Sequence, residues 1–302
     1  MANETNRGIP CLLKTETPAL QIENFNNFDL QNQLGMQAYN SGRTDPTALA
    51  VTKSDQKLTM SVIDISVLAS IGFAGCKLTN TTLYYDQFEN YGLRKSGGAI
   101  TAKAATAFAV PESLSLKPNQ MAELGISIYP ISADGQAQPI TLSKNQTVPP
   151  VSTGEKYLYT FAGITINDET IEAKEVSIDF GLQATIDNDG VSKYPTLAFI
   201  AARAPKVSVS SPRFDLLDKY GINGTKQAGN IVIKLQKHVS RTAQPLPLTE
   251  QKHITITITG GYITCNSANG QSDIEITPVC DSGGAIVSIN TSAALKTPPA
   301  QG

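Results

Sequence analysis

The amino-acid sequence repeats part of itself, and this duplication constrains the fold more than any single motif. Residues 126–131 read Ile-Ser-Ile-Tyr-Pro-Ile and lead into Asp134-Gly135. Residues 274–279 read Ile-Glu-Ile-Thr-Pro-Val and lead into Ser282-Gly283, at a constant offset (274 − 126 = 148). Because apolar residues, proline and turn glycine all recur, we expect one folding unit to occur twice. Duplicated units are typical of assemblies, since a repeated fold can use one interface to build rings or arrays.

A second pair of similar segments lies upstream of the first, in the same order in both halves. Residues 85–93 match residues 214–222 at a smaller offset (214 − 85 = 129). The difference between the two offsets (148 − 129 = 19) predicts an insertion of that length in the second half. We place this insertion between His238 and His253.

Length and proline content predict two domains. A chain of 302 residues can form two domains that each bury a core. Residues 143–155 contain Val-Pro-Pro-Val-Ser-Thr-Gly, and the boundary is expected there because proline interrupts strand pairing. The first domain would span residues 1–150, with an exposed arm or loop at about 40–52. The second would span 151–302, with an inserted loop at 239–252 and a short polar tail.

The dominant period of the sequence is two, which is the period of a β-strand. Residues 253–259 alternate strictly between apolar and polar side chains, as in a half-buried strand. Turn signals such as Asp134-Gly135 and Asn269-Gly270 separate such segments, and many short strands of this kind are typical of sandwiches and barrels. Further strands are expected at residues 58–67, 99–105, 123–131, 157–166, 171–186, 196–201, 206–210, 230–237, 273–279 and 285–289.

One short helix is expected in each half. In residues 83–91 four aromatic side chains recur at helical spacing before Gly92, a residue suited to end a helix. Residues 212–220 repeat this pattern before Gly221, and Pro212 suits a first turn. Such an aromatic stripe could be a ligand platform, but we expect it to be core. The predicted fold class is mainly β, with two tandem β-sandwich or barrel domains of similar fold, each with one short α-helix.

Charge and composition argue against nucleic-acid readers and enzymes. The formal net charge is −2 with 24 basic residues, which gives little attraction to phosphate backbones. The two histidines, His238 and His253, flank the inserted loop but have no neighbouring carboxylate or thiol to complete a metal site. Residues 224–229 have P-loop glycine spacing without the Lys-Ser/Thr, and residues 187–190 resemble a calcium loop without its other ligands. We therefore predict no enzyme activity, no cofactor, and no catalytic or metal-binding residues.

The four cysteines and the N-terminus bear on the redox compartment and on location. Cys11, Cys76, Cys265 and Cys280 form no C-x-x-C motif, so buried free thiols are expected. A hairpin centred on Asn269-Gly270 would place Cys265 opposite residue 273 or 274, and a disulfide from Cys265 to Cys280 is the alternative. The N-terminus lacks the apolar segment of a signal peptide and no run is long enough to span a membrane, so we expect synthesis in the cytoplasm.

The inserted loop supplies the candidate subunit-interface residues. It carries Pro245, Leu246, Pro247 and Leu248 between polar flanks. Leucine and proline exposed at a loop tip either cover the protein's own core or anchor a neighbouring subunit. In a duplicated chain we favour the anchor.

Three features carry a resemblance to a known family. They are residues 175–181 followed by Tyr194-Pro195-Thr196, a short helix that ends in Tyr-Gly, and a hairpin in which Ile-x-Ile-x-Pro precedes an Asp/Gly turn. With these features the sequence resembles the major tail tube proteins of long-tailed bacteriophages, including those with a duplicated tube domain. The resemblance implies a sandwich or barrel with a flanking helix, and rings that stack into a tube. Trimeric rings would mimic hexamers if each chain supplied two of six positions.

The resemblance also implies a location and partners. The protein would be a structural component of the virion tail, made in the host cytoplasm, with itself as partner and only transient, non-specific contact with passing DNA. An acidic or neutral channel is expected, because clustered arginine would hold phosphates. A capsid decoration, baseplate or surface-adhesin protein would share this composition and is the alternative. A carbohydrate-active β-sandwich enzyme would require a cleft with paired carboxylates.

Overall fold

A computed structural model describes most of the chain. It covers residues 7–23, 25–39, 48–88, 98–150, 157–188, 190–224, 226–239, 244–268, 270–279 and 285–296. The protein is mainly β: of the residues that the structure describes, 65% lie in strands, which form antiparallel sheets, and two short helices are present among them. This confirms the predicted mainly-β class.

The described elements group into three sheets. The earlier strands are β1 (Arg7–Thr15), β2 (Leu20–Ile22), β3 (Phe25–Tyr39), β4 (Ala48–Val62), β5 (Cys76–Phe88), β6 (Ala99–Leu116), β7 (Glu123–Ile131) and β8 (Ile140–Gln146). The later strands are β9 (Tyr157–Ile166), β10 (Glu169–Ile171), β11 (Glu175–Asp179), β12 (Leu182–Asp187), β13 (Leu197–Arg203), β14 (Lys206–Ser211), β15 (Lys226–Gln227), β16 (Ile231–Val239), β17 (His253–Ile258), β18 (Gly261–Ala268), β19 (Gln271–Pro278) and β20 (Val287–Ala293). One sheet has 13 strands, a second contains β9, β10, β16, β17 and β20, and β12 pairs with β13 in a third.

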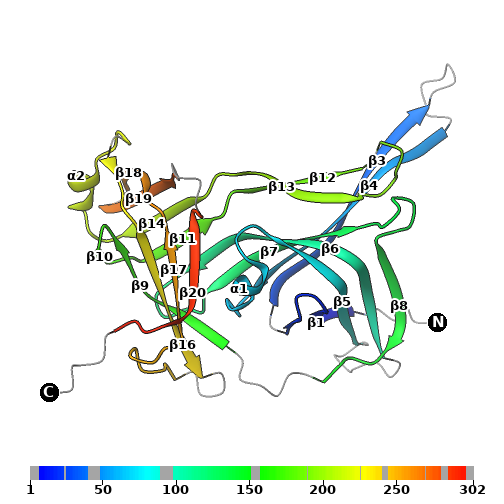
Figure 1. The fold of residues 1–302 in the computed structure, drawn as a ribbon, viewed down its shortest axis with the longest axis horizontal. Helices are drawn as coiled ribbons and strands as arrows, with labels where there is room; N and C mark the ends of the chain where they lie inside the picture. Colours follow the sequence, from blue (N-terminus) through cyan, green and yellow to red (C-terminus); the bar gives the residue numbers. More distant parts are fainter. Residues whose placement is uncertain are drawn as a thin grey trace.

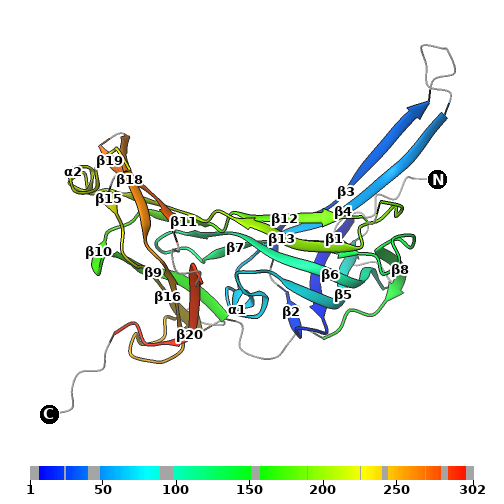
Figure 2. The same ribbon diagram turned by 45° about the horizontal axis from the view of Figure 1, so that its top comes forward.

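The molecule is elongated, with the later strands at one end and the earlier strands at the other (Figure 1). Strands β18 and β19 lie with α2 (Leu216–Tyr220) at the first end, and β1, β5 and β8 lie at the second. The β3–β4 hairpin projects beyond the rest of the molecule in both orientations (Figure 2). The β12–β13 hairpin runs from the α2 end toward β3 and β4.

The strand pairings of β1–β8 recur in β9–β20 with the same register. Leu58 in β4 lies opposite Ile128 in β7, and Val207 in β14 lies opposite Ile276 in β19. The equivalent positions therefore keep nearly the same offset on both strands (207 − 58 = 149 and 276 − 128 = 148). We call β1–β8 the first repeat and β9–β20 the second repeat.

The correspondence extends to every strand of the two repeats. Strands β1 and β2 correspond to β9 and β10, β3 to β11 with β12, β4 to β13 with β14, β5 to β15 with β16, β6 to β17 with β18, β7 to β19, and β8 to β20. A register shift also recurs, between Gly35 and Met36 in β3 and between Gln183 and Ala184 in β12. A β-bulge at the same place in both hairpins is a specific feature that chance pairing does not reproduce.

The two helices are equivalent, but the first one is not where the aromatic pattern predicted it. Helix α1 is Val67–Ile71, and the glycines that follow α1 and α2, Gly72 and Gly221, have φ values of 72° and 71°. The predicted helix at 83–91 is wrong over residues 83–88, which lie in β5, while residues 89–91 lie outside the described part. In β5 the aromatic residues pack across strands, and the ring of Tyr85 meets that of Phe28 edge-on at 5.9 Å. The predicted helix at 212–220 is confirmed at 216–220.

The predicted insertion between His238 and His253 is also wrong, because it depended on aligning residues 85–93 with residues 214–222. The true counterpart of residues 214–222 is the segment around α1, because Gly72 and Gly221 have the offset of the repeat (221 − 72 = 149). Leu83 pairs with Ala102 (102 − 83 = 19), and the equivalent pair is Ile233 with Ile256 (256 − 233 = 23). The connection between these strands is thus only slightly longer in the second repeat (23 − 19 = 4).

Several predicted boundaries also change. Strand β4 begins at Ala48, so residues 48–52 of the predicted exposed loop are in a strand, and residues 40–47 lie outside the described part. The strand predicted at 58–67 ends at Val62, before α1. The predicted boundary segment, residues 143–155, overlaps the end of β8 at residues 143–146, and residues 147–150 follow that strand. Residues 151–156 and most of the C-terminal tail lie outside the described part.

Candidate assembly interface

The two repeats are joined by an antiparallel pairing of β6 with β11. Asp179 lies opposite Ser113, Ile178 opposite Leu114, and Val176 opposite Leu116. The ladder continues one step further, where the Phe180 amide donates to the carbonyl oxygen of Glu112 at 2.9 Å. The four apolar side chains of these pairs are fully buried. We call this pairing the internal joint.

Further contacts between the two repeats lie beside the internal joint. The Lys117 ammonium lies 3.2 Å from the Glu175 carboxylate, although both side chains are nearly half exposed, so this ion pair adds little. The connection between β6 and β7 reaches β9, where the Ala122 amide donates to the Tyr159 carbonyl at 2.9 Å. In the second repeat the equivalent strands, β18 and β19, are joined by a tight hairpin in which Ala268 lies opposite Gln271.

The β12–β13 hairpin extends from the second repeat onto the first. Its turn contacts the loop that follows β7: the Ser132 amide donates to the Pro195 carbonyl at 2.8 Å, and the Tyr194 amide donates to the Gly135 carbonyl at 3.0 Å. The bend into this hairpin lies at Gly181, which has a φ of 56°. A Cβ at Gly181 would collide with the carbonyl oxygen of Ala204, so only glycine fits the bend. Figure 1 shows the hairpin crossing from one repeat to the other.

Asp134 organises the loop that receives this hairpin. Its Oδ1 accepts from the Ala137 amide at 2.8 Å, the Gln136 amide at 2.9 Å and the Ser132 hydroxyl at 3.0 Å. These hydrogen bonds, led by that from Ala137, lower the pKa of the Asp134 carboxyl below its usual value.

Replacing Asp134 by alanine should therefore loosen the loop without unfolding the chain. We expect faster amide hydrogen exchange at Gln136 and Ala137 in the variant, because both amides lose their acceptor. A lowered native pKa means that the stabilisation is complete above the usual aspartate pKa and is lost as the pH falls through the native value. An NMR titration that finds an ordinary or raised pKa for Asp134 would contradict this role.

The internal joint uses an edge of β6 in the first repeat and an edge of β11 in the second. The equivalent edges, on the end of β18 in the second repeat and on β3 in the first, have no strand partner in the described chain. The segment of β18 from Asn266 is equivalent to the part of β6 in the joint, because Asn266 lies opposite Asp273 as Ser113 lies opposite Gly125. The start of β3 is equivalent to β11, and in the described residues β3 pairs only with β4.

Burial differs sharply between the used and the unused edge. Leu30 in β3 and Ile178 in β11 lie opposite equivalent core residues, Leu58 and Val207. Ile178 is completely buried, whereas Leu30 is 38% exposed. Leu34 and Met36, further along β3, are exposed as well. An uncovered edge strand with exposed apolar side chains is a site for pairing with another chain.

The predicted interface residues lie in the loop between β16 and β17, and this loop is bound to its own repeat. The Leu246 amide donates to the Lys237 carbonyl at 2.9 Å, and the Leu295 amide donates to the Leu248 carbonyl at 2.8 Å. Leu246 and Leu248 are half-buried, and Pro245 and Pro247 are exposed. The loop therefore packs partly on its own repeat and also exposes its two prolines. Its role as an anchor for a neighbouring subunit stays a prediction.

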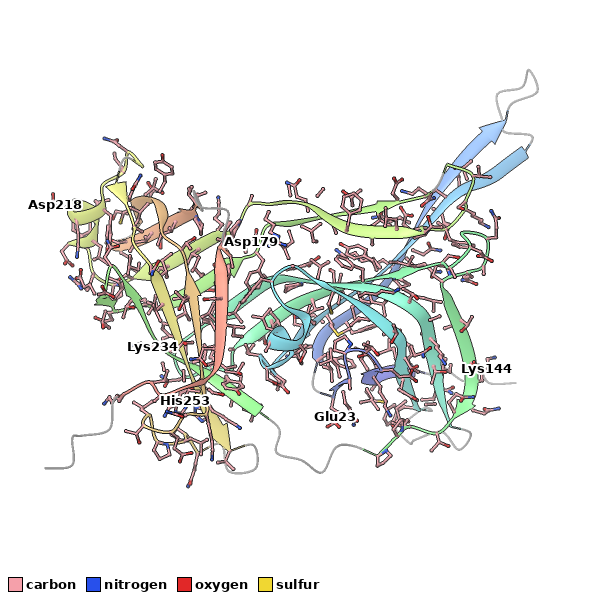
Figure 3. The ribbon with its side chains drawn as sticks, in the orientation of Figure 1. Glu23, Lys144, Asp179, Asp218, Lys234 and His253 are labelled. Atoms are coloured by element: carbon pink, nitrogen blue, oxygen red, sulfur yellow. The ribbon has the colours of Figure 1, made fainter. Side chains whose placement is uncertain are left out.

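The histidines beside this loop have structural contacts. His253, labelled in Figure 3, is the first residue of β17 and is fully buried. Its Nδ1 accepts from the Lys237 amide at 3.0 Å, and its Nε2 lies 2.8 Å from the Pro247 carbonyl oxygen. His238 contacts the Thr160 hydroxyl at 2.7 Å. Across the described segments, no group of three or more His, Cys, Asp and Glu side chains is arranged to hold a metal ion.

Three of the four cysteines lie in the described part of the chain. Cys11, Cys76 and Cys265 form no disulfide, and Cys280 lies outside the described residues. Cys265 lies opposite Ile274, as the hairpin prediction required. Of the helices in the described segments, none is long and apolar enough to cross a membrane.

Comparison with protein-family models and with curated proteins gives no match to this chain.

Proposed function

We propose that the protein is a structural virion component that assembles into rings, and that the rings stack into a tail tube through which DNA passes. In this proposal the two repeats are tandem sandwich- or barrel-like domains, each with one helix, and the chain is not an enzyme. Three chains per ring would supply six similar positions. The partner of each chain is then another copy of itself.

The observation that carries the proposal is the head-to-tail character of the internal joint. Different surfaces of the two repeats meet in it, β6 of one and β11 of the other. The counterparts of these surfaces are the end of β18 from Asn266 and the start of β3, whose outer edges have no strand partner in the described segments. A head-to-tail contact between similar units closes into a ring when its rotation allows, and otherwise continues as a helical filament.

The outward face of the central strands suits a channel for DNA. Along β11, β14 and β19 the buried residues alternate with small or charged ones: Glu175, Ser177, Asp179, Lys206, Ser208, Ser210, Asp273, Glu275 and Thr277. Lys206 is the one cation in this set, and its ammonium lies 2.9 Å from Glu275. Such a surface offers passing phosphates little to bind.

The tip of the loop between β16 and β17 is proposed as a contact between stacked rings. Pro245 and Pro247 are exposed and lie on the loop that joins β16 to β17, away from the internal joint. A capsid decoration, baseplate or adhesin protein remains the second candidate, because sheet edges can also pair in shells and fibres.

Negative-stain electron microscopy of the purified protein tests the proposal. We expect rings with an open centre, and stacks of such rings at high protein concentration. Particles without a central opening would favour the second candidate, and a monomer at every concentration would refute the assembly proposal.

A further inference from the structure

We propose that β3 of one chain pairs with β18 of a second copy, antiparallel and in the register of the internal joint. The inference rests on the proposed ring and adds to it the strands that meet and the residues that face each other. It follows from applying the register observed once within the chain to the equivalent pair of free edges.

The β3 side of the register is set by its pairing with β4. Leu30 lies opposite Leu58, just as Ile178 lies opposite Val207 in the second repeat. Leu58 and Val207 are equivalent positions, so Leu30 takes the place of Ile178. The next residue, Gln31, takes the place of Asp179.

The β18 side is set by its pairing with β19. Asn266 lies opposite Asp273 and Ser267 opposite Ser272. In the first repeat Ser113 lies opposite Gly125 and Leu114 opposite Leu124. Both pairs of partners keep the offset of the repeat (273 − 125 = 148 and 272 − 124 = 148), so Asn266 takes the place of Ser113 and Ser267 that of Leu114.

Combining the two sides gives the contacts between chains. The internal joint places Asp179 opposite Ser113 and Ile178 opposite Leu114. The joint between chains therefore places Gln31 opposite Asn266, Leu30 opposite Ser267, and Asp29 opposite Ala268.

The chemistry of these pairs is compatible with assembly from folded chains. Gln31 and Asn266 are both exposed, and their side-chain amides can donate to and accept from each other. Leu30 loses its exposed surface when β18 covers it, as Ile178 does under β6. No lysine or proline lies in β3 between residues 28 and 31, although these residues commonly protect an edge strand from pairing.

Paired cysteines test the register directly. In the internal joint the Phe180 amide is bonded to Glu112, so the neighbouring pair of Asp179 and Ser113 occupies a non-hydrogen-bonded site. Side chains approach most closely at such sites. The chain carrying Gln31→Cys with Asn266→Cys should therefore form disulfides between chains under mild oxidation, visible as covalent oligomers on a non-reducing gel.

The matched control moves one thiol along the same face. Gln33→Cys with Asn266→Cys places the thiols diagonally, about 7–8 Å apart between chains, too far for a disulfide without strand movement. Each single variant measures crosslinking to the native thiols. We expect at least a tenfold faster crosslink in the Gln31 pair than in the Gln33 pair.

The outcomes separate this inference from the proposed function. Rings on the microscope grid with equal or absent crosslinking in the two pairs would overturn the register and leave the ring in place. A protein that remains monomeric on the grid would overturn both.

Discussion

Leu30→Lys should abolish ring assembly and leave the monomer folded. In the monomer Leu30 is 38% exposed at a free edge, so a lysine there can reach solvent. In the proposed joint between chains, its position would correspond to that of Ile178, which is completely buried in the internal joint. Burying an unpaired ammonium costs several kcal/mol, and about 3 kcal/mol per joint weakens association by roughly 100-fold. Sedimentation velocity over a concentration series measures this effect.

Leu142→Lys is the control for the effect of added charge. Leu142 is 69% exposed on β8, which pairs with the opposite end of β6 from the internal joint. This variant should assemble like the original chain, and both variants should have nearly unchanged melting temperatures. Normal rings from the Leu30 variant would mean that the edge of β3 is not an interface.

Phe180→Ala should have the largest effect on the stability of the fold. Phe180 follows β11 at the bend into the β12–β13 hairpin, is 2% exposed, and packs its ring against Phe73 at 5.4 Å. Its removal leaves a cavity at the place where the two repeats meet. Truncating a buried phenylalanine costs about 3–5 kcal/mol of unfolding free energy, which chemical denaturation can measure.

Phe199→Ala is the matched control on the same hairpin. Phe199 lies in β13 and is 42% exposed, so its loss should cost less than about 1 kcal/mol. Equal destabilisation by the two substitutions would show that the bend at Phe180 does not hold the repeats together.

The local sequence pattern predicted strands best where one face is buried and the other is polar. The alternation in residues 253–259 became β17, and residues 123–131 and 157–166 became β7 and β9 at their predicted boundaries. Strand β3 was missed because its exposed edge and long hairpin carry many Asn and Gln residues, which are typical of loops. The aromatic residues of β5 were wrongly assigned to a helix because their spacing also fits a helix. In the structure they lie in a strand, where their rings pack against neighbouring strands.

The duplication was predictable, but the joint between the repeats was not. The match between residues 126–131 and 274–279 correctly pairs β7 with β19. Pairing of β6 with β11 connects segments that are far apart in the sequence, and no local pattern sets its register. The candidate interface residues Pro245, Leu246, Pro247 and Leu248 were selected for composition alone, whereas the edges of β3 and β18 emerge only from the strand order.

The mass of the purified protein in solution tests the central claim most directly. If the internal joint repeats between chains, native mass spectrometry should find a closed oligomer, and three chains of 32.1 kDa each are expected in one ring. A single 32.1 kDa species at all concentrations would contradict the account.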